Sequence, residues 1–466
     1  MRRLFAVRPA TLTTAAALAV ALLLPLASPA TAAPTKQASP STAAARPTNP
    51  DDPRGDAYTT KKVKSKCSTH VCVHWVNTTV DKPPAGQPDV VLTQMNKIWK
   101  FEVDKLGFRS PLPDGKRGGN KKLDVYLKDV GSKGYAGYCT KDKKVGNGYL
   151  ASAYCVLDND FQPDQFDGHK ALNTLRATAA HELFHAIQLA YDSDEDAWLV
   201  ESTATWMEER YADKVNDNRK YLPSSQIALP WSPLDMAGSG GTTQFGNWIW
   251  WEYLTKSRKL GDKIVRTVWE NAGEYNGGGS MYSTRAVVKA LEKKGTFNKL
   301  YRDFAAANTT PAKTYEEGAA WSVSAPMDAD PVLTSGKSTG GSLEVDHLAS
   351  RHVRIRPGSS VTGANQRLLV KIDGPSSKSA PAAVVQVRYK SGKVTRKVLA
   401  LDAAGKGKGT VLFDASQISN VIVTVVNAST RFDCWTRPSA DPAYSCTGSP
   451  RDDNRVFTWS ATSTTA

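Results

Sequence analysis

The chain has 466 residues, 40% of them hydrophobic and 23% charged, and a formal net charge of +15. Its length indicates two or three domains rather than a single core. The basic residues are scattered, apart from clusters at 61–66 and 141–144, and no aromatic residues interleave those clusters as they do in nucleic-acid binders. We therefore expect no nucleic-acid partner, and we interpret the excess as a solvated surface that is compatible with contact to anionic cell-wall polymers.

Residues 1–33 have the pattern of a secretory signal peptide. Three arginines precede an apolar run, and Ala-Thr-Ala at 30–32 gives a small-x-small cleavage signature. The run is too short to span a bilayer comfortably, and Pro25 interrupts it. No later stretch is long and apolar enough to cross a membrane, so we expect a secreted, extracellular protein without membrane insertion.

Residues 34–57 are rich in Pro, Ser, Thr and Ala, and we expect them to form a disordered leader or a short propeptide. The six cysteines fit export, because disulfides are the default in an oxidising compartment. Sequence alone leaves many connectivities open. Pairing of nearest neighbours closes three small loops and leaves no odd thiol, so we predict the disulfides Cys67–Cys72, Cys139–Cys155 and Cys434–Cys446.

The next part of the chain, 58–333, indicates strands first and helices afterwards, an α+β pattern. Helical spacing predicts a helix over 88–106, and strands are predicted over 123–127 and 149–157, on either side of a glycine-tyrosine loop at 131–138. The loop at 158–168 is acidic and of the kind that can bind Ca²⁺, although it lacks EF-hand spacing. Further helices are predicted over 170–190, 198–212, 245–254, 264–269, 286–291 and 300–306.

Two features of the later chain complete the expected organisation. Trp248, Trp250 and Trp251 could line a groove, but we interpret them as helix core because apolar residues share their segment. Residues 334–341 have the composition of a linker, rich in Ser, Gly and Lys. Short β-type runs with turn residues between them then predict an all-β sandwich over 342–466. The predicted runs are 352–355, 367–372, 384–389, 394–401, 410–413 and 421–426.

The most specific motif is His181-Glu182-Leu183-Phe184-His185, within the predicted helix 170–190. Residues four apart lie about 40° apart around a helix axis, so His181 and His185 project from one face and can hold one metal ion. Glu182 is turned by about 100°, close enough to reach a water on that ion. Zinc lowers the pKa of such a water, and the glutamate accepts its proton. The alternative is a pair of ordinary helix histidines.

A catalytic zinc takes three protein ligands, so a third must come from elsewhere. Position 191 is Tyr and position 188 is Gln, which excludes the third histidine of a metzincin. Glu201 is the candidate, because it is the only charged residue within 198–207 and a lone carboxylate among apolar residues is costly unless paired or metal-bound. A buried salt bridge of Glu201, and ligation by His169 instead, are the alternatives.

The zinc motif, followed by Trp198-x-x-Glu201-x-x-Ala204-x-Trp206, resembles the gluzincin branch of zinc metallopeptidases, and more narrowly a family of secreted bacterial metallopeptidases. The resemblance covers roughly residues 85–320. It implies a two-lobed zincin-like domain with the active helix on the cleft floor and an upper-lobe edge strand that pairs with extended substrate.

The resemblance also implies roles for residues outside the zinc motif. Ala151-Ser152-Ala153-Tyr154 stands where gluzincins have their edge strand, so Ala153 and Tyr154 are expected to bind substrate, although the usual asparagine is missing. Gluzincins use a downstream His or Tyr to steady the oxyanion. Tyr211, Tyr221 and Tyr253 are the alternatives here, because the histidines after the motif lie far downstream.

Together these features predict a secreted zinc-dependent peptidase with one Zn²⁺ per chain. His181, His185 and Glu201 are the expected metal ligands, and Glu182 is the expected general base. The expected partner is a protein or peptide substrate, and the protein is expected to be a monomer. The alternative is a secreted binding or adhesion protein with an inactive zincin domain, but the intact Glu182 favours the enzyme.

Overall fold

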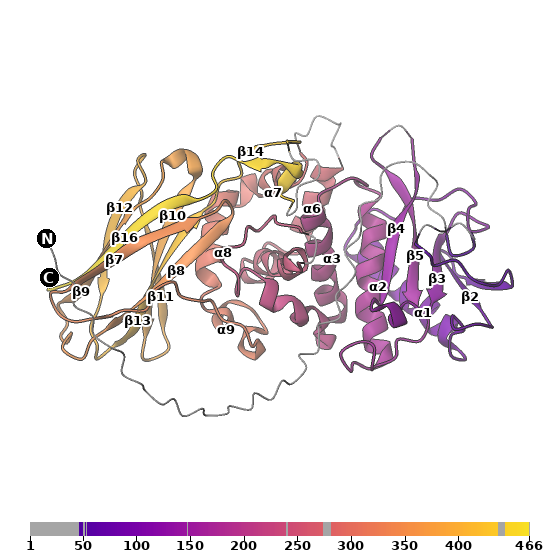
Figure 1. The fold of residues 1–466 in the computed structure, drawn as a ribbon, viewed down its shortest axis with the longest axis horizontal. Coiled ribbons are helices and arrows are strands. Elements are labelled where there is room, and N and C mark those ends of the chain that lie inside the picture. Colours follow the sequence, from indigo (N-terminus) through magenta and orange to yellow (C-terminus); the bar gives the residue numbers. More distant parts are fainter. Residues whose placement is uncertain are drawn as a thin grey trace, which may run out of the picture.

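The computed structural model describes residues 46–49, 52, 54–146, 148–238, 241–273, 281–436 and 443–465. The protein is α+β with several sheets, as the order of predicted elements indicated. A mixed sheet lies at one end of the molecule, helices occupy the middle, and a β-sandwich lies at the other end (Figure 1). The predicted signal peptide and most of the predicted leader lie outside the described residues.

The N-terminal sheet has five strands in the order β1-β2-β3-β5-β4. Their bounds are β1 (Val63–Cys67), β2 (Val71–Val76), β3 (Leu123–Lys128), β4 (Gly137–Lys144) and β5 (Ala151–Asp158). Strands β2, β3 and β5 run parallel, while β1 and β4 are antiparallel edge strands. The predicted strands at 123–127 and 149–157 correspond to β3 and β5. Strand β4 was not predicted, because its second half is a run of polar residues without hydrophobic alternation.

One face of this sheet packs against two helices. Helix α1 (Gln87–Trp99) continues as a π-helical segment, η1 (Lys100–Lys105), and α2 spans Ala171–Gln188. Both were predicted from helical spacing. Their apolar sides form one core with inward-facing sheet residues such as Val73, Val125 and Cys155. Helix α2 is therefore fixed against the sheet along its length, which gives the side chains of its motif defined positions.

The other face of the sheet contacts the described end of the predicted leader. Arg46 and Asp56 of that segment are buried, as is Tyr58, which follows it, so this end packs against the sheet rather than being disordered. The Tyr58 hydroxyl donates to the Leu127 carbonyl at 2.7 Å, and Asp56 accepts from the Tyr138 hydroxyl at 2.7 Å. Composition missed this packing because it depends on a few polar contacts to distant residues rather than on a local apolar pattern.

The middle of the molecule is built from helices that pack around buried tryptophans. Trp248, Trp250 and Trp251 are fully buried, so their interpretation as core is confirmed. The predicted helix 245–254 is divided into short segments around Asn247. The elements are α3 (Ala197–Ala212), η3 (Asp213–Val215), η4 (Asp217–Ser224), α4 (Thr243–Gly246), α5 (Trp248–Glu252), η5 (Tyr253–Ser257), α6 (Lys263–Ala272), α7 (Thr284–Leu291), α8 (Phe297–Ala307) and α9 (Pro311–Thr314).

The C-terminal part is a sandwich of two sheets, with strand orders β11-β10-β13-β8-β6 and β12-β9-β16-β7, and it has its own apolar core. The six predicted runs all fall in or overlap strands of these sheets. The strands are β6 (Val332–Leu333), β7 (Ser338–Val345), β8 (Ala349–Pro357), β9 (Gln366–Asp373), β10 (Pro381–Tyr389), β11 (Val394–Leu399), β12 (Lys406–Leu412), β13 (Ile418–Asn427) and β16 (Arg455–Thr465), with a small separate pair, β14 (Phe432–Asp433) and β15 (Ser449–Pro450).

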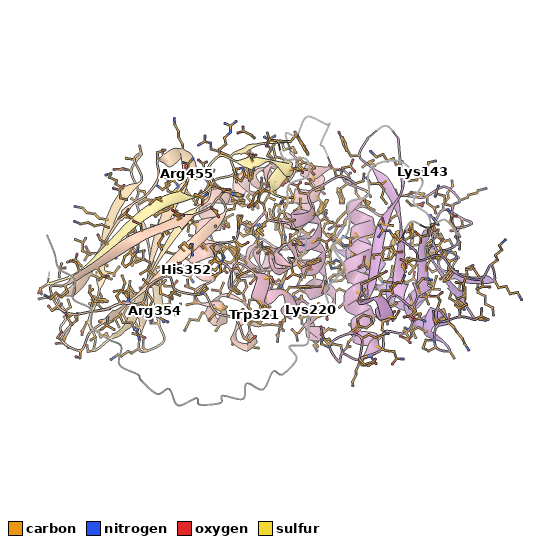
Figure 2. All side chains as sticks on the ribbon, viewed as in Figure 1. Lys143, Lys220, Trp321, His352, Arg354 and Arg455 are labelled. Atoms are coloured by element: carbon orange, nitrogen blue, oxygen red, sulfur yellow. A yellow bond between two sulfur atoms is a disulfide. The ribbon has the colours of Figure 1, made fainter. Side chains whose placement is uncertain are left out.

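The predicted linker at 334–341 is not a linker, because residues Ser338–Gly341 begin strand β7, which pairs with β16. Its small hydroxyl and glycine residues resemble linker composition, but they suit an edge strand whose backbone is hydrogen-bonded. The core of the helical part also extends to Leu348, Val426 and Ala428 of the sandwich. Side chains accordingly fill the region between the helices and the strands (Figure 2).

All three predicted disulfides are present: Cys67–Cys72 joins β1 to β2, Cys139–Cys155 joins β4 to β5, and Cys434–Cys446 closes a loop of the sandwich. Each bond lies within one part of the molecule, so no disulfide among the described residues joins the helical part to the sandwich. None of the helices in the described ranges is long and apolar enough to cross a membrane.

Candidate metal centre

Helix α2 presents the two motif histidines side by side. The helix contains no Gly or Pro and five alanines, which suits its 18-residue length. Because they are four residues apart, His181 and His185 lie on one face, with ring centroids 4.6 Å apart and ring planes at 86°. Such an arrangement points both Nε2 atoms at a common neighbour.

That neighbour is Glu201 on α3, which packs beside α2. Its Oε2 lies 3.3 Å from His181 Nε2 and 3.5 Å from His185 Nε2. The three ligand atoms lie within 4.8 Å of one another. The structure thus brings together the three residues predicted as metal ligands. No lysine or arginine of the described chain pairs with Glu201, and His169 lies instead near Asp217, at 3.8 Å.

Two further side chains fix the imidazole rings from behind. Glu208 accepts from His181 Nδ1 at 2.6 Å. The Gln188 amide donates to the Val200 carbonyl at 2.8 Å, which leaves its Oε1 to accept from His185 Nδ1 at 2.7 Å. Each ring therefore has its Nδ1 held by an acceptor and its Nε2 turned toward the centre, which is the orientation that a metal-bound histidine needs.

Sequence reasoning missed Glu208 and Gln188, although a signal for Glu208 exists. Glu208 follows Glu201 by seven residues, which is about two helical turns, so both carboxylates project from the same face of α3. Gln188 ends α2 three residues after His185, where a side chain can turn back to the ring. The hydrophobic pattern of the two helices did not indicate that Glu208 and Gln188 contact the histidine rings.

Replacement of Glu208 by Ala is expected to weaken metal binding about 10–100-fold, because the His181 ring loses the acceptor that fixes its orientation and tautomer. Glu208→Gln keeps an acceptor oxygen for His181 Nδ1, so its zinc affinity should fall less than that of Glu208→Ala. Titration of each variant with zinc against a chelator of known affinity measures the change. Equal affinity of Glu208→Ala and wild type would contradict this positioning role.

Glu182 lies beside the three ligands without joining them. Glu182 is 7% exposed, and the backbone N–H of Cys139 on β4 faces its carboxylate and favours the charged form. Its Oε2 has no hydrogen-bond partner among the described residues. Burial raises the pKa of Glu182 above its usual range. A carboxylate with a free oxygen and a raised pKa is suited to accept a proton near neutral pH.

The electrostatics of the centre favour a cation. Burial alone lowers the pKa of His181 and His185, yet Glu201 and Glu182 near both rings, together with Glu208 at His181, outweigh burial and raise both pKa values. Burial alone likewise raises the pKa of Glu201, but the two histidines hold it well below its usual range. Three carboxylates around two imidazoles therefore stabilise positive charge at the point where the ligand atoms meet.

The three tyrosines considered for oxyanion contact lie in different surroundings. Tyr253 stacks on Trp250 in the aromatic core, and Tyr211 packs edge-on against Phe101. Tyr221 on η4 stacks on Phe245 at 5.0 Å, and Phe245 in turn stacks on His181 at 6.3 Å. Tyr221 is therefore the tyrosine linked most directly to the metal centre.

The structure does not place Ala153 and Tyr154 on the edge strand that their predicted substrate role assumed. Both residues are buried in β5, and this strand is paired with β3 on one side and β4 on the other. An inner strand has no free backbone edge to offer an extended peptide. The edge strand beside the centre is β4, which carries Cys139; the sequence pattern could not distinguish the edge strand from its apolar neighbour.

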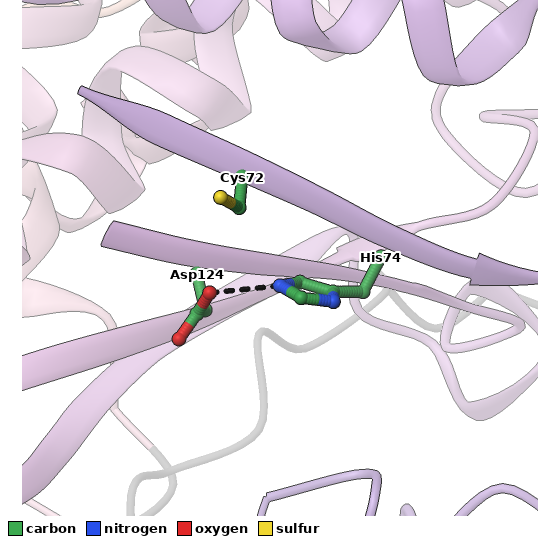
Figure 3. Close-up of side chains that lie close together, drawn as sticks. All are labelled: Cys72, His74 and Asp124. Atoms are coloured by element: carbon green, nitrogen blue, oxygen red, sulfur yellow. Dashed lines mark hydrogen bonds and ion pairs between the residues drawn. The ribbon is translucent and has the colours of Figure 1, made fainter. Parts of the chain in front are cut away.

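A second possible ligand group, Cys72, His74 and Asp124, lies on β2 and β3 (Figure 3). Cys72 is already bonded to Cys67, so its sulfur is not a free thiolate. His74 Nε2 lies 2.7 Å from Asp124 Oδ1, and Asp124 is also paired with Arg46. The group is a buried ion-pair network rather than a metal site.

Other acidic groups show no comparable arrangement. Glu209, Asp213 and Glu317 lie close together, but Glu317 is paired with Arg219 at 2.7 Å. In the loop considered for Ca²⁺, the Asp158 carboxylate accepts backbone N–H groups, including those of the 130–131 turn. No aspartate of that loop belongs to a three-ligand group in the described part of the chain.

Comparisons with known proteins identify one family. A profile described as "Family of unknown function (DUF6055)" matches residues 31–277, more than half of the chain, including the whole candidate centre. No curated protein matches. A solved structure titled "A novel family GH115 4-O-Methyl-alpha-glucuronidase, BtGH115A, with specificity for decorated arabinogalactans" is 9% identical with a TM-score of 0.14, covering 77% of this chain and 53% of that chain. A likeness this weak carries no argument.

Proposed function

The chain belongs to this DUF6055 family, and we propose that it is a secreted zinc-dependent peptidase resembling the gluzincins. The observation that carries the proposal is the convergence of His181, His185 and Glu201, with Glu182 beside them. Two imidazole nitrogens and one carboxylate oxygen are the donor set of a catalytic zinc site that keeps one position open. The retained exposure of these side chains, 11–13%, leaves that position accessible to a small group.

Glu182 is the general base in this proposal. A zinc ion bound by the three ligands would lower the pKa of a water molecule and polarise a substrate carbonyl. Glu182 accepts the proton from that water and passes it to the leaving amine. The Cys139 N–H faces the Glu182 carboxylate, and Glu182 Oε2 has no hydrogen-bond partner in the described chain. Tyr221 is our candidate to steady the oxyanion, because it lies behind Phe245 at the centre.

The substrate in this proposal is an extended peptide. Strand β4 is the last strand of its sheet, so one side of its backbone is available for pairing. An extended peptide adds to such an edge through main-chain hydrogen bonds. Because Cys139 of β4 faces the Glu182 carboxylate, a peptide on this edge would lie next to the general base. Pairing through the backbone supports action on proteins and peptides of varied sequence.

Export also forms part of the proposal. The signal-peptide pattern of residues 1–33 and three disulfides support an extracellular location. The basic surface is compatible with contact to anionic cell-wall polymers. We expect a monomer.

Purified wild-type protein is expected to contain one zinc per chain, and His185→Ala is expected to contain almost none, because two ligands hold zinc far more weakly than three. Elemental analysis after dialysis measures the content, and His169→Ala is the matched control, since His169 lies away from the centre. Wild-type protein that stays metal-free in the presence of micromolar zinc would refute the proposed function.

A further inference from the structure

Arg46 is held in a pocket of three buried aspartates. Its Nε and Nη2 bond Asp142 at 3.2 and 2.7 Å, and its remaining N–H groups bond Asp114 and Asp124. The guanidinium group also lies over the Tyr154 ring, 5.6 Å from its centroid. Side-chain exposure is 4% for Arg46 and at most 2% for the aspartates. The fork of Arg46 therefore fits a site that a simple ammonium group would not fill.

The charges of this pocket do not balance without Arg46. Three carboxylates face Arg46, and among the described residues Arg117, 2.9 Å from Asp142, and His74, 2.7 Å from Asp124, also pair with them. Removing one partner of a buried network leaves the others uncompensated, which costs far more than the loss of an exposed pair. The pocket therefore depends on a residue that precedes the sheet in sequence.

Residues 46–49, 52 and 54–58, here called the N-terminal strap, contact β4 at every second position. Asp56 accepts from Tyr138, Arg54 donates to Thr140 at 2.7 Å, and Arg46 binds Asp142. Alternate residues of a strand share one face, so the strap holds one whole face of β4. The strand has a bulge between Lys141 and Lys143, and Asp142 is the extra residue there.

The opposite side of β4 meets the metal centre. The Cys139 backbone N–H faces the Glu182 carboxylate, and the Cys139 side chain is bonded to Cys155. An edge strand has a partner on one side only, so contacts to its faces do much to set its position. The strap and Glu182 thus lie on two sides of the same strand.

We propose that the N-terminal strap positions the catalytic edge strand, with Arg46 as the positioning residue that pins the Asp142 bulge. The proposal rests on the proposed peptidase function. It implies that the strap belongs to the active protein and that a cut at the exposed Arg54–Gly55 turn would separate Arg46 from the rest of the domain.

The test compares full-length Arg46→Ala, Arg46→Lys and wild type, with Arg451→Ala as the control. Arg451 pairs with Asp433 on the sandwich surface and is half exposed. Arg46→Ala is expected to lower the Tm by about 10 °C, to speed hydrogen exchange of the β4 amides, and to lower kcat/KM about 10–100-fold well below its Tm at unchanged zinc content. Arg46→Lys should show smaller changes in Tm, β4 exchange and kcat/KM than Arg46→Ala, because an ammonium group replaces only part of the guanidinium bonding. Arg451→Ala should equal wild type in all three measurements.

Chemical rescue tests the pocket itself. Guanidinium chloride at about 10 mM should raise the Tm and slow the β4 exchange of Arg46→Ala, because the free ion can occupy the site of the missing side chain. Sodium chloride at the same concentration should not. The proposal would be overturned if both salts rescued Arg46→Ala equally. It would also be overturned if Arg46→Ala, below its Tm, had the same β4 exchange and the same kcat/KM as wild type.

If Arg46→Ala does not fold, a milder variant tests the same proposal. Arg54→Ala removes the exposed contact to Thr140, and it should speed β4 exchange and raise KM about threefold. If the β4 amides of Arg54→Ala exchange as slowly as those of wild type, the proposal that the strap positions β4 is overturned. If zinc-loaded wild type cleaves no peptide, the proposed function fails, while the Tm, exchange and rescue measurements still decide whether Arg46 fixes β4.

Discussion

Glu182→Gln is expected to retain zinc, fold and Tm while losing peptidase activity by a factor of about 10²–10⁴. Glutamine has almost the same shape and can present an amide oxygen to the Cys139 N–H, but it cannot accept a proton from water. Because Glu182 is not one of the three ligands, zinc content should not change. Cleavage of casein and of a broad peptide library, with zinc measured in the same samples, tests this expectation.

The matched control for this substitution is Glu292→Gln, which removes an exposed carboxylate paired with Lys289 and should leave cleavage unchanged. Equal cleavage by wild type and Glu182→Gln would exclude the general-base role. Absence of any cleavage by zinc-loaded wild type would instead favour a secreted binding or adhesion protein with an inactive zincin domain. The two outcomes differ in the wild-type control, so they cannot be confused.

The residues of the candidate centre were accessible from sequence because each signal is local. A four-residue spacing within one helix places His181 and His185 on one face, and a single carboxylate in an apolar helix singles out Glu201. Neither signal requires knowledge of which elements become neighbours. The contact between α2 and α3 then follows from their shared core, and it brings Glu201 to the two rings.

The features that sequence did not indicate depend on contacts between distant residues. The bonds of Arg46 join it to residues 68 to 96 positions later, so no window of sequence contains both partners. Strand β4 has a polar outer half, which hid it, and the more apolar β5 was taken for the edge strand. Strand β7 was concealed by its glycines and serines, since its backbone pairing with β16 leaves little signal in side-chain hydrophobicity.

Stability is expected to fall between pH 6.5 and about 9 because of a buried histidine between the helical part and the sandwich. His347 is fully buried, with Nε2 2.9 Å from Asp235 of the helical part and Nδ1 against Asp453 of the sandwich. The rings of Phe432 and Tyr444 cover it edge-on. Burial opposes the charged form, but the two aspartates outweigh burial and raise the pKa of His347 to about 9.

The sign of the pH effect follows from this raised pKa. The folded protein holds the His347 proton more tightly than the unfolded chain, whose pKa is about 6.5. The stabilisation is therefore complete below pH 6.5 and is lost as the pH rises through about 9. A shift from 6.5 to about 9 corresponds to roughly 3 kcal/mol in the free energy of unfolding.

His347→Gln should show this loss of stability already at pH 6.5 and a flatter profile up to pH 9, since glutamine cannot take up the proton between Asp235 and Asp453. Urea denaturation of wild type and variant at several pH values gives the difference, which removes the contribution of other titrating groups. His352→Gln is the matched control: burial lowers the pKa of His352 to about 3, so this neutral histidine should not affect the profile above pH 6.5. Parallel profiles for wild type and His347→Gln would show that His347 carries no proton between Asp235 and Asp453 in the folded protein.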